Sequence, residues 1–122
     1  MVKILIVEND KNNRELIAFI LKKRGFEVLE AINGQAGVEM AIKENPDLIL
    51  MDIELPIMNG FKATETLRKN KETKDVPIIA VSGHAQNGHA DKAFNLGFTD
   101  YLIKPFSIAK FLMVVNSHIN KN

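Results

Sequence analysis

The stretch that decides the fold lies near the start of the chain, where Ile4-Leu5-Ile6-Val7 runs directly into Glu8-Asn9-Asp10. Four consecutive apolar residues suit a strand buried on both faces, as in a parallel sheet covered by helices. An amphipathic stretch with helical spacing follows at once. This unit therefore predicts a strand, a short turn and a helix, with acidic groups at the carboxyl end of the strand.

The same alternation recurs along the chain. We expect strands over residues 3–7, 27–31, 48–51, 76–81 and 101–103, the mixed run at 27–31 being typical of a sheet edge. Five strand–helix units in one domain predict an α/β fold with a doubly wound parallel sheet, right-handed crossovers and helices on both faces. The expected helices carry apolar stripes, namely Leu16, Ile17, Ile20 and Leu21 before Gly25; Val38, Ala41 and Ile42 before Asn45-Pro46; Phe61, Thr64 and Leu67; Ala90, Ala93, Phe94 and Leu96 within 87–96; and Ile108, Phe111, Leu112, Val115 and Ile119.

Length and composition exclude several classes of protein. A chain of 122 residues predicts one domain over 1–122 without a second domain. Sixteen basic and fifteen acidic side chains leave no basic excess of the kind that binds nucleic acid. No cysteine is present, which excludes disulfides and thiolate zinc sites. The first apolar run is too short for a signal peptide or a membrane span, so we expect a cytoplasmic protein.

Polar groups at the expected strand ends indicate the functional site. In doubly wound sheets, ligands bind beyond the carboxyl ends of the strands. Here those ends carry Glu8-Asn9-Asp10, Asp52, Ser82 and Lys104. Crowded carboxylates either share a proton or hold a hard cation, and Mg²⁺ is a cation that also bridges to phosphoryl groups. Asp52 would then be a nucleophile that forms an acyl phosphate, with Lys104 and Ser82 stabilising the added charge.

The chain resembles a known family, the response-regulator receiver domains of two-component signalling, and most closely the single-domain, chemotaxis-regulator-like kind. The resemblance covers nearly the whole length and implies a flavodoxin-like strand order of 2-1-3-4-5. It rests on Ile4-Leu5-Ile6-Val7-Glu8, on Leu48-Ile49-Leu50-Met51-Asp52-Ile53-Glu54-Leu55-Pro56-Ile57-Met58-Asn59-Gly60, on Ala80-Val81-Ser82-Gly83, and on Tyr101-Leu102-Ile103-Lys104-Pro105-Phe106.

The resemblance also implies a role for each site residue. Asp52 would accept a phosphoryl group from a histidine kinase or a phosphotransfer protein, with Lys104 pairing with that group and Ser82 donating a hydrogen bond to it. Tyr101 is similar to the aromatic switch of the family; an ordinary core tyrosine is the competing interpretation. The implied Mg²⁺ ligands are Glu8 through water, Asn9, Asp52 and the backbone carbonyl of Glu54, and the Lys104–Pro105 bond is similar to the cis bond of receivers.

Asn9 departs from the family pattern, in which the position of the direct metal ligand is acidic. An amide still coordinates through oxygen, but the lost charge should weaken the hold on a divalent cation. Asp10 would either compensate or cap the following helix, and the cap is the favoured reading. Two functions follow: a phosphorylated receiver with reduced metal affinity, or a receiver-like interaction module that works without phosphorylation. Pro56 stiffens the loop after Asp52, and Gly60 there suits backbone angles closed to other residues.

Two other classes of function use similar chemistry or the same strand order. An aspartyl-phosphate phosphohydrolase would match Asp52-Ile53-Glu54, but it needs further acids and a cap region. A flavin-binding domain would need a phosphate-cradling loop in place of Glu8-Asn9-Asp10-Lys11. The chain is therefore not expected to be an enzyme, although it would assist its own phosphorylation and dephosphorylation. His84 and Glu54, each two residues after a site residue, are candidates for tuning the lifetime of the acyl phosphate.

We expect no effector domain after Lys121-Asn122, so output is expected through binding of a target protein by a monomer or a phosphorylation-dependent dimer. The weakly apolar helix at 87–96 would shift easily, because few contacts tie it to the core. We expect it to form the contact surface together with the last strand and the last helix. Its candidate contact residues are Asn87, Ala90, Asp91, Phe94 and Asn95.

Overall fold

The apolar runs of the sequence form the five parallel strands of one sheet, in the order β2-β1-β3-β4-β5. The computed structural model describes residues 1–83 and 89–119. Both the α/β class and the strand order are confirmed, and β2 lies at an edge as expected. The strands are β1 (Lys3–Val7), β2 (Glu27–Ala31), β3 (Leu48–Asp52), β4 (Ile78–Ser82) and β5 (Asp100–Ile103).

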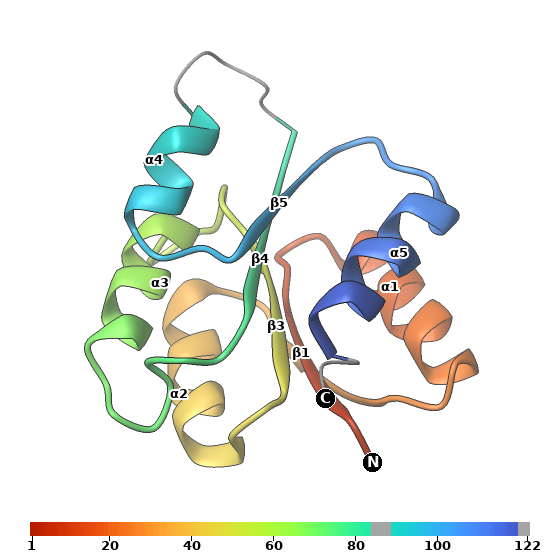
Figure 1. The fold of residues 1–122 in the computed structure, drawn as a ribbon, viewed down its shortest axis with the longest axis horizontal. Helices are drawn as coiled ribbons and strands as arrows, with labels where there is room; N and C mark the ends of the chain where they lie inside the picture. The colour runs from red at the N-terminus through yellow and green to blue at the C-terminus, as the bar shows by residue number, and fades with distance from the viewer. Residues whose placement is uncertain (84–88, 120–122) are drawn as a thin grey trace.

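A helix follows each strand, so the sheet is covered on both faces. Figure 1 shows α1 and α5 on one side of the sheet and α2, α3 and α4 on the other. This is the doubly wound arrangement that right-handed crossovers in both directions produce. The helices are α1 (Lys11–Lys23), α2 (Gly34–Glu44), α3 (Gly60–Arg68), α4 (His89–Asn95) and α5 (Ile108–Ile119).

The core explains why the strands are apolar at successive positions. Side chains alternate across a strand, so Ile4 and Ile6 pack with α1 and α5, whereas Leu5 and Val7 pack with the helices on the other face. Every residue of β3 and β4 is buried. An alternating polar pattern would have placed polar groups against one helical layer without partners.

Helix ends lie where the sequence places capping residues. The side chains of Asp10, Asn33 and Asn59 accept hydrogen bonds from backbone N–H groups in the first turns of α1, α2 and α3. Gly25 follows α1 with a φ of 89°, and Asn45 ends α2 in the left-handed region. Both expected helix stops are confirmed.

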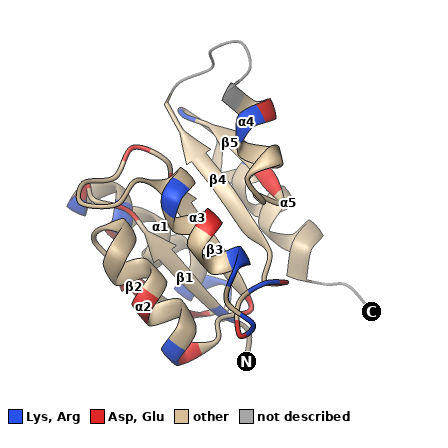
Figure 2. Cartoon of the chain, turned by 90° about the vertical axis from the view of Figure 1, so that its left-hand side faces the viewer, with Lys and Arg blue, Asp and Glu red and all other residues tan. Residues whose placement is uncertain are grey.

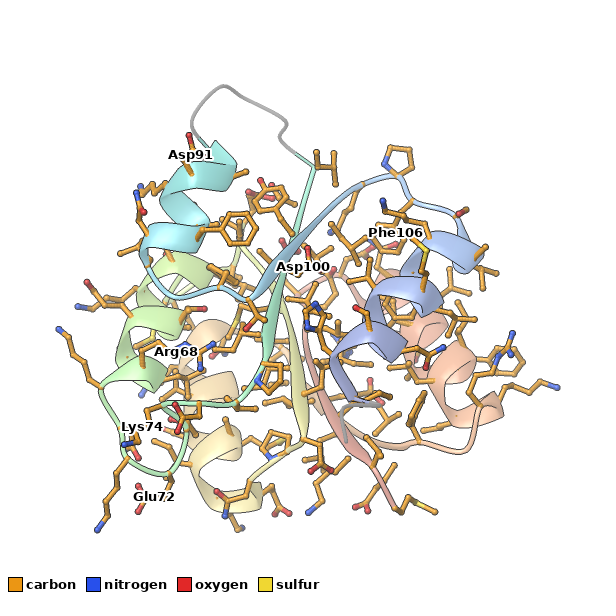
Figure 3. The ribbon with its side chains drawn as sticks, in the orientation of Figure 1. Arg68, Glu72, Lys74, Asp91, Asp100 and Phe106 are labelled. Atoms are coloured by element: carbon orange, nitrogen blue, oxygen red, sulfur yellow. The ribbon has the colours of Figure 1, made fainter. Side chains whose placement is uncertain are left out.

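The start of β4 differs from the prediction, which placed Val76 inside the strand. The Val76 carbonyl instead accepts a hydrogen bond from Arg68 Nη1 at 2.7 Å, and Pro77 lacks an N–H group for the ladder. Arg68 also bonds the carbonyl of Gly97 at 2.8 Å. Its side chain therefore ties the loops before β4 and β5 together, and Figure 3 shows it among these segments. The strand begins only at Ile78.

Three residues of the expected core stripes are exposed, namely Leu16, Phe94 and Ile108. Leu16 on α1 and Ile108 on α5 keep 56% and 54% of their surface, because the two helices leave a groove between them. Phe106 stacks on Phe111 at its floor, with ring centroids 5.6 Å apart. The groove has a volume of about 480 Å³ and is lined by Asn13, Leu16, Ile17, Ile20, Lys104, Pro105, Phe106, Ile108 and Phe111.

Charged side chains of both signs recur along the same helices (Figure 2), in keeping with the near balance of sixteen basic and fifteen acidic residues. Across residues 1–83 and 89–119, the structure contains no helix with the length and apolarity required to cross a membrane.

Candidate functional site

The carboxyl ends of four strands bring distant residues to one point. Glu8 directly follows β1, Asp52 ends β3, Ser82 ends β4 and Lys104 follows β5. The Lys104 ammonium lies 3.1 Å from Glu8 Oε1 and 3.2 Å from Asp52 Oδ2. Glu8, Asp52 and Ser82 are buried, being 3%, 6% and 0% exposed. The sequence predicted polar groups at these strand ends, and the strand order that brings them together was implied by the family resemblance.

Both carboxylate oxygens of Asp52 have a donor. Oδ2 accepts from the Lys104 ammonium, and Oδ1 accepts from the backbone N–H of Glu54 at 3.1 Å. Glu54 reaches back with its own exposed side chain, whose Oε2 accepts a hydrogen bond from Ser82 Oγ at 3.1 Å. Asp52, Glu54, Ser82 and Lys104 therefore form one connected network around the acceptor carboxylate.

The charges of the site do not balance. Burial, followed by hydrogen bonding and charge from Glu8, raises the pKa of Asp52 from 3.8 to about 6, against the opposing effect of Lys104. Burial pulls the pKa of Lys104 down, but the charges of Asp52 and Glu8 and their hydrogen bonds outweigh it and raise that pKa overall. The Lys104 ammonium thus pairs with two buried carboxylates, Glu8 and Asp52.

The loop after Asp52 turns back closely on the strand end. A Cβ on Gly60 would lie 2.4 Å from the Asp52 carbonyl oxygen and 2.7 Å from Ile53 Cα, so only glycine fits. The expected reason for this glycine was wrong, since Gly60 is not among the residues with positive φ. Ile57 instead has a φ of 68°, which is rare for a β-branched residue.

The turn after β1 separates the roles of Asn9 and Asp10. Asp10 caps α1, with Oδ2 3.4 Å from the backbone nitrogen of Asn13, and its own N–H donates to Glu8 Oε2 at 3.0 Å. The favoured interpretation of Asp10 as a cap is therefore confirmed. Asn9, between Glu8 and this cap, is exposed.

Arg14 is a residue that sequence reasoning missed. Its guanidinium donates to the backbone carbonyl of Glu8 at 3.0 Å and to that of Asn9 at 3.5 Å, and it pairs with Glu30 Oε1 at 3.1 Å. These bonds fix the backbone of the β1–α1 turn. A cation near the N-terminus of a helix interacts unfavourably with the helix dipole. That placement was the sequence feature that could have indicated a structural role for Arg14.

The donor set fits a hard cation. Glu8, Asn9, Asp52 and the Glu54 carbonyl offer oxygen only, which suits Mg²⁺. Burial and the neighbouring Glu8 raise the pKa of Asp52, so a second positive charge beside Lys104 would favour the ionised carboxylate. Within the described part of the chain, however, no group of three or more His, Cys, Asp or Glu side chains has metal-binding geometry. A metal ion here would therefore need the Asn9 amide, the Glu54 carbonyl and water as ligands in addition to the carboxylates of Glu8 and Asp52.

The remaining site residues lie at β5 and beyond. Tyr101 is half-buried and packs against the core on the α2–α4 face, and its N–H donates to Asp100 Oδ1 at 2.8 Å. The Lys104–Pro105 bond is cis, as expected. His84 and Asn87 lie outside the described residues.

Comparisons with known proteins show the family of the chain. Residues 4–116 match the family described as response regulator receiver domain. The chain is 38% identical to Protein PilH of Pseudomonas aeruginosa over 117 residues, covering 96% of the chain and 97% of PilH. It is 40% identical over 120 residues to hybrid signal transduction histidine kinase G of Dictyostelium discoideum, covering 96% of the chain but only 4% of that protein.

A solved structure is similar over the same length. The receiver domain of sensor histidine kinase PA1611 from Pseudomonas aeruginosa PAO1, with a magnesium ion coordinated in its active site cleft, superposes with a TM-score of 0.91. The two share 32% sequence identity, and the match covers 98% of each chain. Fold and sequence thus agree over nearly the whole chain.

Proposed function

The chain belongs to the response regulator receiver domain family, and from that premise we propose that Asp52 accepts a phosphoryl group from a histidine kinase or a phosphotransfer protein. Receiver domains partner histidine kinases in two-component signalling. The family consists of regulators and not of enzymes that turn over a separate substrate, so the phosphohydrolase and flavoprotein alternatives are set aside. The observation that supports the proposal is the buried Asp52 carboxylate, held between the Lys104 ammonium and the Glu54 N–H.

The proposed reaction is phosphoryl transfer to a carboxylate oxygen of Asp52. With a pKa of about 6, Asp52 is mostly ionised at neutral pH and available as a nucleophile. The P–N bond to the donor imidazole breaks as the P–O bond to Asp52 forms, and the leaving imidazole takes up a proton. Lys104 stabilises the charge gathering on the phosphoryl oxygens, and the Ser82 hydroxyl donates a hydrogen bond to one of them.

We propose that Glu8, Asn9, Asp52 and the backbone carbonyl of Glu54 hold Mg²⁺ at the same point. When bound, the ion offsets carboxylate charge and orients phosphoryl oxygens. The likeness to the magnesium-bound PA1611 receiver domain supports this assignment. Glu8 and Asp52 supply the full negative charges, whereas the amide of Asn9 supplies only an oxygen dipole, so we expect weaker metal binding than an acidic residue at position 9 would give.

Asn9→Asp is expected to tighten Mg²⁺ binding about tenfold, because it adds a full charge at the mouth of the site. Isothermal titration with Mg²⁺ measures the change. The double variant Asn9→Asp/Asp10→Asn is the matched control, since it keeps the net charge and asparagine also caps helices well. Both variants should bind the ion more tightly than wild type. Unchanged affinity in both would show that position 9 does not contact the metal.

A receiver-like module that binds partners without phosphorylation is the second candidate function. The neutral Asn9 side chain favours it, as does the Lys104 ammonium that already bridges Glu8 and Asp52. In that case the site would be a structural ion pair. Binding of the target protein would then be the same for wild type and for Asp52→Ala.

We propose that output passes through α4, β5 and α5 to a target protein. The chain would act in the cytoplasm, as a monomer or as a phosphorylation-dependent dimer. Asp91, Phe94 and Asn95 are exposed on α4, Ala90 is half-buried there, and Ala93 anchors the helix to the core. Figure 3 shows Asp91 on the outer side of this helix. We assign the switch between the site and this surface to Ser82 and Tyr101.

Acetyl phosphate tests the proposed function directly. Incubation with and without Mg²⁺, followed by intact mass measurement, should give a single labile phosphoryl adduct that requires the ion. Asp52→Ala should give none while keeping its fold by circular dichroism. An adduct of equal yield in Asp52→Ala would contradict the proposal, and no adduct in wild type at any Mg²⁺ concentration would favour the phosphorylation-independent module.

A further inference from the structure

The side chain of Glu54 is bonded to the hydroxyl that the acceptor site is proposed to use. Ser82 Oγ lies 3.1 Å from Glu54 Oε2 and 3.4 Å from Oε1. Ser82 is fully buried, whereas Glu54 is exposed in the loop after β3. The carboxylate therefore reaches inward from solvent to a buried hydroxyl.

This contact competes with phosphoryl binding. A hydroxyl has one proton to donate, and a carboxylate is a strong acceptor for it. The Glu54 N–H donates to Asp52 Oδ1 at 3.1 Å, so the backbone of Glu54 is fixed beside the acceptor while its side chain points at Ser82. A phosphoryl oxygen on Asp52 and the Glu54 carboxylate would therefore approach the same hydroxyl from neighbouring positions, and both are anionic.

We propose that Glu54 is a positioning residue that holds the Ser82 hydroxyl in the resting site, and that a phosphoryl group on Asp52 must displace it. The inference rests on the proposed function of Asp52. It assigns the Glu54 side chain a role separate from the backbone carbonyl that would face the metal. Repulsion between the Glu54 carboxylate and the added phosphoryl group helps release Ser82, so the contact links phosphorylation to movement at the end of β4.

A double-mutant cycle tests the contact, with the rate of adduct formation from acetyl phosphate as the readout. In this reaction the P–O bond to acetate breaks, a P–O bond to Asp52 forms, and acetate leaves. Removing the Glu54 charge also eases the approach of an anionic donor, with or without Ser82. Glu54→Ala is therefore measured in the wild-type and in the Ser82→Ala backgrounds, and the ratio of its two effects isolates the contact.

We expect Glu54→Ala to speed adduct formation about 3- to 10-fold more in the wild-type background than in Ser82→Ala, the gain expected from releasing a hydrogen bond to a partly solvated charge. Glu54→Asp keeps the charge but is one methylene shorter, so it should show most of the same coupling. Glu39→Ala, which removes an exposed charge from α2, should leave the rate unchanged. Thermal melts of all variants report any loss of fold.

Two failures are distinguishable. If wild type forms no adduct on Asp52, the proposed function and this inference both fall. If wild type forms the adduct but Glu54→Ala and Glu54→Asp change its rate equally in both backgrounds, only the inference is overturned. Glu54→Ala could also depend on the Ser82 background while Glu54→Asp does not. That result would assign the effect to the charge of Glu54 alone and would also overturn the inference.

Discussion

Asp52→Asn should unfold at a higher temperature than the wild-type chain at pH 7.5. Asp52 binds a proton more tightly in the folded chain, with a pKa of about 6, than in the unfolded chain, with 3.8. The folded state therefore holds more protons between about pH 4 and pH 6, and the contribution of Asp52 to stability falls as pH rises through that window. Above it, the ionised side chain costs up to about 3 kcal/mol of folding free energy.

The asparagine variant removes this cost but keeps the shape of the side chain. We expect it to be about 2 kcal/mol more stable at pH 7.5, which raises the melting temperature by about 5 °C or more. In wild type, the ionisation of Asp52 should lower the free energy of unfolding between pH 4 and pH 6. In Asp52→Asn most of this decrease should be absent. Asp75→Asn, at an exposed site, should change stability by less than about 0.5 kcal/mol. If Asp52→Asn melts at a lower temperature than wild type at pH 7.5, ionisation of Asp52 does not cost the chain folding free energy.

Lys104→Met is expected to slow phosphorylation by acetyl phosphate about 100-fold or more, because it removes the only ammonium within 4 Å of Asp52 and Glu8 among the described residues. It should also raise the pKa of Asp52 further, since the charge and hydrogen bond of Lys104 are what lower it. Single-turnover rates across pH separate the two effects. At high pH, where Asp52 is ionised in both chains, the loss of rate reports transition-state charge alone.

Lys104→Arg is the matched control. It keeps the positive charge but replaces the compact ammonium with a planar guanidinium. The pKa of Asp52 should therefore stay near that of wild type, while the phosphorylation rate should lie between those of wild type and Lys104→Met. If Lys104→Met phosphorylates at the wild-type rate, Lys104 does not contact the transferred group.

The sequence predicted most of the sheet because burial on both faces leaves a plain signal. β1 and β2 have the expected bounds, and the convergence of Glu8, Asp52, Ser82 and Lys104 follows from parallel strands whose carboxyl ends meet. The start of β4 was predicted two residues too early. Val76 is a typical strand residue, but its carbonyl is bonded to Arg68 of the preceding helix. Pro77, which has no N–H group for the ladder, was the local signal for the later start.

The details of the site were harder to predict because they depend on the paths of loops and on bonds to backbone groups. The spacing of Glu54 from Asp52 suggested an effect on the acyl phosphate, but the bond from Ser82 to its carboxylate spans 28 residues of sequence and depends on the path of the loop. Arg14 was missed because its partners are backbone carbonyls, which carry no residue type. Leu16 and Ile108 follow the apolar stripe yet stay exposed, since periodicity shows the face of a helix but not how closely two helices pack.

The central claim is that the carboxylate of Asp52 carries the phosphoryl group. An acyl phosphate is reduced by borohydride to homoserine, whereas a phosphorylated hydroxyl is not. After treatment with acetyl phosphate and Mg²⁺, reduction and peptide mapping should find homoserine at position 52 and aspartate unchanged at the other positions. Homoserine at another carboxylate, or a borohydride-resistant phosphate on Ser82, would contradict the account.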